Sequence, residues 1–302
     1  MHFQRSTLFL LGLVAVVIGA LLVAGCTGTG NTPIPTPTGT TTDNAGSFVP
    51  SGASGKISVT GSTTVLPIAQ ALAERYMDLN QGADIQVSGG GSSVGVTAVG
   101  ERTAEIGMAS RELKDAETAK YPALEPIAIA RDGIAVIVHP SNAVAHLTLD
   151  QVREIYAGNV TNWKDVGGQD RQIVAIGRDS ASGTREFFTE KVMGTTNTAA
   201  TMLEKNSNGA IQSSVAPNPG AIGYVGLGYL DATVRAIPLS VDGAAVAPTL
   251  ENVVNGRYPV ARELYFVTSG GATGLAQDFV AFALSSEGQQ IVEKQGFIPV
   301  AA

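Results

Sequence analysis

The chain has 302 residues, of which 44% are hydrophobic and 15% are charged, which is the composition of a folded protein with one large or two medium domains. The formal net charge is −7, so no basic surface for nucleic acid is expected. The single cysteine excludes a disulfide framework and a cysteine-built metal site, and the three histidines leave little material for metal or proton-transfer chemistry. We therefore predict neither a metal nor a cofactor.

The first 26 residues have the order of an export signal. Arg5 precedes an uncharged apolar run at 8–24, whose last small residues lead through Gly25 into Cys26. This end resembles the lipobox of secreted lipoproteins, so cleavage before Cys26 and lipid attachment to it are expected. A membrane helix with an incidental cysteine is the alternative. Both readings place the rest of the chain outside the cytoplasm, and the first anchors it to the outer face of the cytoplasmic membrane.

Residues 27–55 are rich in Thr, Pro, Gly and Ser and are predicted to form a disordered tether. Beyond them, strand-like and helical patterns alternate, which predicts an α/β fold with a largely parallel sheet covered on both faces. The predicted strands are 57–60, 84–87, 105–108, 126–130, 133–139, 173–176, 222–225 and 265–268. The predicted helices are 65–80, one starting at residue 92, 149–157, 183–193, 272–284 and 286–295.

Three strand-to-helix corners share the same residue types. They lie at 60–64, 88–93 and 177–185, and each combines glycine with serine or threonine just before a helical pattern. Such corners resemble helix N-termini, where unpaired amides and the helix dipole attract anions. Each corner alone is most simply an ordinary helix cap. Because parallel strands bring such corners to one side of a sheet, the three together predict an anion site.

Arginines stand beside these corners. Arg178 and Arg185 flank the Ser-Gly-Thr of the third corner, and Ser110 and Arg111 follow the strand predicted at 105–108. A guanidinium can donate two parallel hydrogen bonds to an oxyanion, so these arginines are candidate ligands. A solvated surface position is the alternative for Arg111.

The corner segments resemble, in order along the chain, the phosphate-binding lipoproteins of ABC importers. The resemblance runs from Lys56 to near the C-terminus and includes Gly220–Val225. It implies a type II periplasmic-binding-protein fold, in which two α/β lobes are joined by two crossover strands and a ligand cleft lies between them. The expected first lobe is 56–131 with 242–302, and the expected second lobe is 132–241.

The resemblance implies a solute-binding protein that captures inorganic phosphate between its lobes and delivers it to the permease subunits of an ABC transporter, without enzyme chemistry. The phosphate would be held by backbone amides, hydroxyl groups and arginine. With the Ser110–Arg111 pair added, the expected ligand residues are Ser62, Thr63, Thr64, Ser92, Ser93, Ser110, Arg111, Arg178, Ser182, Gly183 and Thr184.

The chain departs from the family pattern at two positions. Well-known members have an aspartate where Arg111 stands, which accepts the phosphate proton and repels sulfate, and another where Ser180 stands. A proton acceptor must therefore come from elsewhere, and Asp132 and Asp179 are the candidates. Tungstate, molybdate and sulfate stay open as alternative ligands, because they are tetrahedral oxyanions that use the same donors.

A serine hydrolase is the alternative from another class. Residues 91–95 match G-x-S-x-G, the nucleophile turn of α/β-hydrolases, with Ser93 in the central position. The catalytic histidine would have to be His139 or His146, the two that follow Ser93. Neither has an orienting carboxylate nearby in the sequence, so the binding protein is the favoured interpretation.

Overall fold

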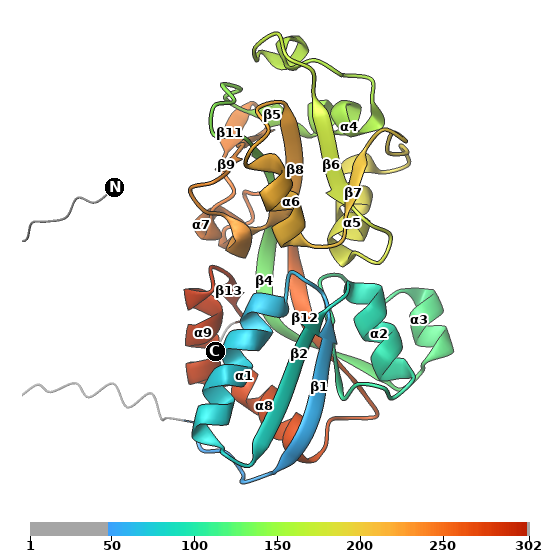
Figure 1. Ribbon diagram of the computed structural model, residues 1–302, viewed down its shortest axis with the longest axis vertical. Coiled ribbons are helices and arrows are strands. Elements are labelled where there is room, and N and C mark those ends of the chain that lie inside the picture. Colours follow the sequence, from blue (N-terminus) through green and yellow to red (C-terminus); the bar gives the residue numbers. More distant parts are fainter. Residues whose placement is uncertain (1–47, 301–302) are drawn as a thin grey trace, which may run out of the picture. The chain divides into compact units, whose positions relative to one another are not determined.

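The computed structural model describes residues 48–300. The predicted signal peptide, the lipidation site Cys26 and the tether up to residue 47 lie outside the described residues. Within 48–300 the chain forms two α/β lobes that are linked by two long strands (Figure 1). No helix of this part is both long and apolar enough to cross a membrane.

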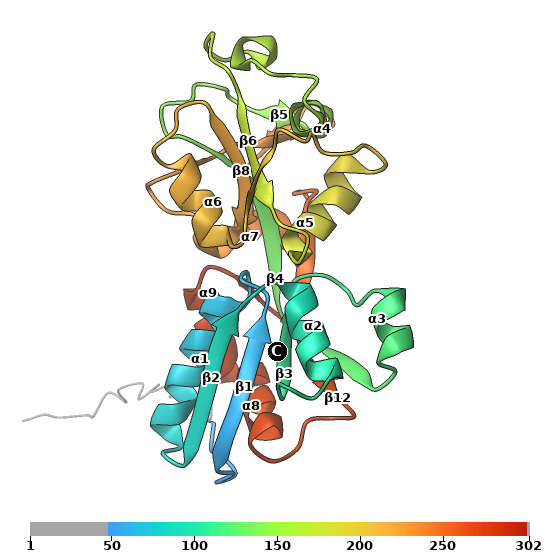
Figure 2. The ribbon, with the colours of Figure 1, turned by 45° about the vertical axis from the view of Figure 1, so that its right-hand side comes forward.

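The first lobe has the strand order β2–β1–β3–β12–β4, with β1 parallel to both of its neighbours. Helices cover both faces of the sheet (Figure 2). Besides the two crossover strands, its elements are β1 (Gly55–Gly61), α1 (Leu66–Leu79), β2 (Ala83–Gly89), α2 (Ser92–Gly100), β3 (Ile106–Ala109), α3 (Asp115–Lys120), α8 (Gly274–Leu284), α9 (Ser286–Lys294) and β13 (Ile298–Pro299).

Helix α1 shows how the apolar pattern builds this lobe. Its buried residues include Ile68, Leu72 and Tyr76, which recur at the helical period and therefore share one face. This face packs with Phe279 of α8 and Val292 of α9 in one core cluster. Helix α2 packs on the other face of the sheet in a separate, smaller cluster, so both faces are covered as the sequence predicts.

The second lobe continues the sheet in the order β4–β8–β6–β7, and three short strands form a separate sheet, β11–β10–β5. Trp163 is buried in this lobe, and its indole Nε1 donates to Gly220 O at 3.0 Å, as expected for a packing anchor. The elements are β5 (Leu147–Thr148), α4 (Leu149–Ala157), η1 (Trp163–Val166), β6 (Val174–Arg178), α5 (Gly183–Phe188), η2 (Thr189–Met193), β7 (Leu203–Lys205), α6 (Asn208–Val215), β8 (Ala221–Gly226), η3 (Leu227–Tyr229), β9 (Arg235–Ala236), β10 (Leu239–Val241), β11 (Ala244–Val246) and α7 (Leu250–Val254).

The two crossover strands are β4 (Leu124–Val138) and β12 (Ala261–Ser269), which pair antiparallel. The sequence predicts two strands separated near Asp132, because polar residues interrupt the apolar run there. The structure has one continuous strand, since Asp132 lies opposite Arg262 of β12 and forms an ion pair with it. The predicted parallel pairing is correct for β2–β1–β3 and for β8–β6–β7, whereas the crossover strands β4 and β12 run antiparallel to their neighbours.

The end of the second lobe differs from the predicted range. Val253, Tyr258 and Val260 fall in the segment 242–302 that was expected in the first lobe, yet they are buried in the core cluster of the second. The reason is that α7 and the loop after it pack back on the second lobe before the chain leaves it. The chain returns to the first lobe only through β12.

The last residues of the predicted tether also have packing partners. Phe48 lies 5.2 Å, between ring centroids, from Phe282, and the Ser51 amide donates to Asp278 Oδ2 at 2.8 Å. An aromatic side chain gains enough from burial to hold a short segment against a core. Residues 48–55 therefore belong to the folded part of the chain.

Candidate functional site

Small hydroxyl side chains from several corners meet where the two lobes come together. They follow β1 and β3 and begin α2 in the first lobe, and they begin α5 in the second. None of them is more than 6% exposed. We call these seven residues the hydroxyl cluster: Ser62, Thr63, Thr64, Ser92, Ser110, Ser182 and Thr184.

The cluster spans the boundary between the lobes. Thr64 Oγ1 of the first lobe lies 2.9 Å from Thr184 Oγ1 of the second. The Ser93 amide donates to Ala181 O at 3.2 Å, also across the boundary. At Gly183, an added Cβ would collide with Ser92 Oγ, so glycine permits the closest approach here. The lobes are therefore closed on each other around the predicted anion site.

Local hydrogen bonds hold the corners in shape. Ser182 caps α5, because its Oγ accepts from the Arg185 amide at 3.2 Å. In the first lobe, Ser92 Oγ accepts from the Ser110 amide at 3.0 Å, which joins two of the corners. Gly91 has φ = 102°, a conformation that favours glycine, and a Cβ there would lie 2.5 Å from Ala181 O. The glycines thus allow both the turn and the contact between lobes.

Arg178, at the end of β6, is 1% exposed, so its guanidinium charge is buried. Its Nε donates to Lys205 O at 3.3 Å and its Nη2 to Asn206 O at 3.1 Å. No carboxylate within residues 48–300 forms an ion pair with it. Burial lowers the pKa of the Arg178 guanidinium, because the charged form is desolvated, and the charge of the neighbouring Asp179 opposes part of this fall. Such a buried cation requires an anion nearby.

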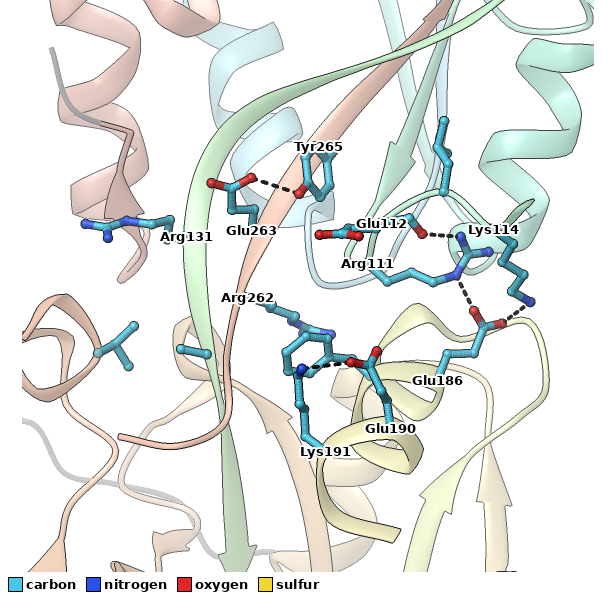
Figure 3. A pocket seen from close by; sticks show the side chains of 14 residues that line it. Arg111, Glu112, Lys114, Arg131, Glu186, Glu190, Lys191, Arg262, Glu263 and Tyr265 are labelled. Atoms are coloured by element: carbon cyan, nitrogen blue, oxygen red, sulfur yellow. Dashed lines mark hydrogen bonds and ion pairs between the residues drawn. The ribbon is translucent and has the colours of Figure 1, made fainter. Parts of the chain in front are cut away.

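Arg111, in contrast, already has anionic partners. It forms an ion pair with Glu117 at 2.7 Å. It also pairs with Glu186 of the second lobe, which binds Lys114 at 2.8 Å (Figure 3). We call Arg111, Lys114, Glu117 and Glu186 the rim network. Ser93 contacts this network, since its hydroxyl accepts from Arg111 Nη2 at 3.2 Å and donates to Glu186. The ligand roles expected for Arg111 and Ser93 stay predictions.

A cavity of about 610 Å³ lies beside the rim network and the crossover strands (Figure 3). Its lining includes residues of both charges, among them the cations Arg111, Lys114 and Arg262 and the anions Glu186 and Glu263. Apart from Arg111, none of the expected ligand residues lines it. The cavity is therefore distinct from the hydroxyl cluster, which is packed tightly in the closed molecule.

Of the two candidate proton acceptors, Asp132 is fully buried and already bonded. Its Oδ1 accepts from the Leu227 amide at 2.9 Å, and its Oδ2 accepts from Arg262 Nε at 3.1 Å and Nη2 at 2.8 Å. Burial raises the pKa of the Asp132 carboxyl, and the neighbouring guanidinium opposes that rise. Asp179 is half-buried, and its Oδ1 has no hydrogen-bond partner within residues 48–300.

The structure adds residues that the sequence analysis missed. Arg262 Nη1 donates to Ser110 O at 3.0 Å, and Tyr229 donates its hydroxyl proton to Thr63 O. Asn208, the first residue of α6, donates to Thr63 and Thr64. Asn206–Gly209 is a fourth strand-to-helix corner of small polar residues, so composition alone could have identified Asn208. Nothing in the sequence indicated Arg262.

The geometry does not assemble the hydrolase alternative. The side chain of Ser93 contacts Arg111 and Glu186, not a histidine. His139 lies in the second lobe, where its Nδ1 is 2.8 Å from Ser141 Oγ. Among the residues that the structure describes, no group of three metal-ligating side chains comes together either.

Comparison with known proteins identifies the family. Residues 37–287 match the model of the PBP superfamily domain. The phosphate-binding protein PstS of Bacillus subtilis strain 168 is 37% identical over 250 residues, which cover 82% of each chain. The protein of the same name from Pseudomonas aeruginosa PAO1 is 32% identical, and the match covers 83% of this chain and 85% of that protein.

Solved structures agree with this assignment. The X-ray structure of a Clostridium perfringens protein with bound phosphate has a TM-score of 0.77 and 39% identity, and covers 82% of this chain and all of its own. An ABC-type phosphate transport receptor from Vibrio cholerae has a TM-score of 0.67 and 31% identity over the same share of this chain. The expected type II periplasmic-binding fold is thereby confirmed. The chain belongs to the PBP superfamily and, within it, to the family of the phosphate-binding proteins PstS.

Proposed function

We propose that the protein captures inorganic phosphate between its lobes outside the cytoplasm and delivers it to the permease of an ABC transporter, without catalysing a reaction. The observation that carries this proposal is Arg178, a buried guanidinium that lacks a carboxylate partner within the described residues, at the end of the strand that leads into the hydroxyl cluster. A small oxyanion supplies both the missing charge and the acceptors that hydroxyl and amide groups require. The family assignment supports the same ligand.

The proposed ligand residues come from both lobes, so binding and closure are coupled. Micromolar affinity corresponds to about −8 kcal/mol. Hydrogen bonds to a charged partner contribute about 1.5–3 kcal/mol each, so the donors of this site suffice after desolvation and closure. The residues that we assign to phosphate are Ser62, Thr63, Thr64, Ser92, Ser110, Arg178, Ser182, Gly183 and Thr184.

Two of the sequence-based candidates have a different place in this proposal. Arg111 and Ser93 hold the rim network, because their polar atoms contact Glu117, Glu186 and each other. For the ligand proton, Asp179 is the better candidate acceptor, since the oxygens of Asp132 already receive hydrogen bonds from Arg262 and Leu227. Sulfate, molybdate and tungstate remain the alternative ligands.

The site of action follows from the first residues of the sequence. We assign residues 1–26 to a lipoprotein signal peptide and Cys26 to the lipidated position, with the tether linking the lobes to the membrane. Membrane fractionation of cells that express the protein tests this assignment. Replacement Cys26→Ser is expected to release the protein from the membrane fraction, and unchanged membrane attachment contradicts a lipid on this residue.

The ligand is tested by isothermal titration of the purified protein with phosphate, sulfate and molybdate. We expect one phosphate per chain at micromolar affinity or tighter, and a loss of at least about 100-fold in Arg178→Ala, which removes a charged, dry contact. Arg171→Ala is the matched control, because Arg171 is an exposed arginine of the same lobe. Phosphate affinity that is unchanged in Arg178→Ala contradicts the proposal.

A further inference from the structure

Asn208 is a fully buried amide that reaches across the lobe boundary to the hydroxyl cluster. The Gly226 amide donates to Asn208 Oδ1 at 3.4 Å, which fixes the orientation of the side-chain amide. The NH₂ group therefore points the other way, and Nδ2 lies 3.2 Å from Thr63 Oγ1 and 3.0 Å from Thr64 Oγ1. Since an amide NH₂ group can only donate, both threonine oxygens accept from Asn208.

The direction of the next hydrogen bond follows from the number of acceptor positions on a hydroxyl. Thr64 Oγ1 also accepts from Arg262 Nη2 at 3.2 Å, and a guanidinium likewise can only donate. A hydroxyl has two acceptor positions and one proton, so both acceptor positions of Thr64 are used. Its proton must point to Thr184 Oγ1, which lies 2.9 Å away.

Within residues 48–300, this series of hydrogen bonds ends at two hydroxyl protons for which no acceptor is present. Thr184 Oγ1 receives the Thr64 proton, and within residues 48–300 it makes no other hydrogen bond. Thr63 Oγ1 accepts a hydrogen bond from Asn208, and within the same residues it forms no second hydrogen bond. Both side chains are nearly fully buried, at 1% and 6% exposure, so their protons need an acceptor in the site.

We propose that Asn208 and Arg262 are positioning residues that direct the hydroxyl protons of Thr63 and Thr184 into the site. The site then selects a ligand that presents a hydrogen-bond acceptor to each of these two protons. The inference rests on the proposed function, because an oxyanion is such a ligand. Neither residue needs to contact the anion. A purely structural role, in which Asn208 only fills space between the lobes, is the competing explanation.

Asn208→Asp tests the donor role of Asn208, because the two side chains have nearly the same shape. An ionised carboxylate accepts only, so it turns the protons of Thr63 and Thr64 toward itself and adds a negative charge near the anion. A protonated carboxyl can donate again. The defect should therefore depend on pH, with the larger loss where the introduced carboxyl is ionised, and burial moves its pKa upward into an accessible range.

The experiment measures phosphate affinity by isothermal titration at pH 5, 6, 7 and 8, with every variant expressed relative to the wild type at the same pH. We expect the phosphate affinity of Asn208→Asp to fall about 100-fold at pH 8 and about 10-fold at pH 5. The affinity of Asn208→Ala should fall about 10-fold at every pH, which is the size of the loss of one hydrogen bond to a charged group. Asn218→Asp is the control, because it adds the same charge in the loop that follows the other end of α6. Equal losses in both Asn208 variants at every pH overturn the proposal.

A double-mutant cycle gives an independent test if Asn208→Asp fails to fold, as judged by its thermal unfolding. Thr64→Val keeps the shape of Thr64 but removes its hydroxyl. We expect Asn208→Ala to weaken phosphate binding much less in this background than in the wild type, because part of its effect passes through Thr64. Fully additive losses overturn the proposal. If the wild type binds no phosphate, the proposed function itself fails, which is a separate outcome.

Discussion

The hydroxyl cluster with Arg178 and the rim network both lie where the lobes meet, but they differ in how their polar groups are satisfied. The first combines small neutral donors with one buried arginine that has no carboxylate partner in the described chain. The second places two cations against the carboxylates of Glu117 and Glu186. The charges of the rim are thus paired with each other, whereas Arg178 forms no ion pair with a carboxylate of residues 48–300.

This difference assigns the two regions different tasks. In the proposed function an anion completes the cluster, so its donors are expected to contribute to affinity and to ligand choice. The rim network needs no ligand, so its cross-lobe ion pairs contribute to the closed state. The distinction matters in a chain of net charge −7, because long-range electrostatics oppose anion capture and recognition must come from local, dry donors.

Removing the negative partner of Arg262 should have the largest effect on stability. In Asp132→Asn, a second guanidinium next to the cluster loses its counter-charge while it stays buried. Breaking one side of such a buried pair costs about 3–5 kcal/mol in the free energy of unfolding. Urea unfolding of the phosphate-free protein, followed by circular dichroism, measures the change.

Asp84→Asn is the control for this experiment. The Lys56–Asp84 pair has the same charges at 3.9 Å, but both side chains are more than half exposed. Exposed pairs contribute about 1 kcal/mol or less. A loss in Asp132→Asn no larger than that in Asp84→Asn contradicts the view that Arg262 depends on its partner.

Gly183→Ala should separate binding from stability. The added Cβ would collide with Ser92 Oγ and lie 2.9 Å from Ser110 Oγ, so the closed arrangement cannot form unchanged. Gly183 begins α5, where alanine is a better helix former, so the second lobe itself is not weakened. We expect phosphate affinity to fall about 30-fold or more, as typical overpacking costs of about 2 kcal/mol imply, while the thermal midpoint without phosphate is unchanged or slightly raised.

Gly209→Ala provides the matched control. Gly209 also lies in the first turn of a helix of the second lobe, but an added Cβ there meets no atom within 4 Å. Affinity measured by isothermal titration should stay at the wild-type value in this variant. Equal affinity in Gly183→Ala and Gly209→Ala would show that the lobes do not close as tightly as the structure has them.

Glu186→Gln tests the rim with a smaller effect. The change removes the cross-lobe ion pairs of Glu186 with Arg111 and Lys114, while Glu117 still neutralises Arg111. Partly exposed pairs contribute about 1 kcal/mol, so the phosphate affinity of Glu186→Gln should be about five-fold lower than that of the wild type. The difference from wild type should shrink at high salt, which screens such pairs.

Glu190→Gln controls for the loss of a carboxylate from the same stretch of helix. Glu190 is exposed and pairs only with Lys191 of its own lobe within the described residues, so closure should not depend on it. If both glutamate variants bind phosphate equally well at low and high salt, the rim network has no part in closure.

The sequence predicted the features that depend on neighbours in the chain. Helix α4 begins and ends at the predicted residues, Leu149 and Ala157, because apolar periodicity and a capping threonine define it locally. The strand-to-helix corners were found in the same way, since glycine and hydroxyl residues mark a helix start whatever surrounds it. Three such corners do converge in the hydroxyl cluster.

The partners of charged residues could not be predicted, because they lie far apart in the sequence. Arg262 and Asp132 are 130 residues apart, and Asn208 and Thr64 are 144 apart. The first contact depends on the register of β4 with β12, and the second on how the lobes close. The ion pair of Arg111 with Glu186 was missed for the same reason, since nothing near Arg111 in the sequence indicates this residue of the second lobe.

The smallest expected effect concerns the pH dependence of the rim. Partial burial raises the pKa of Glu117, but hydrogen bonds from Arg111 and the Lys114 amide outweigh it and hold the pKa below its usual value. Because the folded pKa lies below the unfolded one, this carboxylate stabilises the protein fully above the unfolded pKa of roughly 4.3. The contribution is lost as the pH falls through the folded pKa.

Glu117→Gln should therefore lower the thermal midpoint near neutral pH and flatten its decline between pH 6 and 3, measured without phosphate. The control is Glu112→Gln, since Glu112 is exposed and its side chain forms no ion pair within residues 48–300. Parallel midpoint curves for the two variants would mean that Arg111 gains its stability from Glu186 alone. In that case the charge of Arg111 would be balanced only in the closed molecule, and opening the lobes would separate its guanidinium from the carboxylate on which it depends.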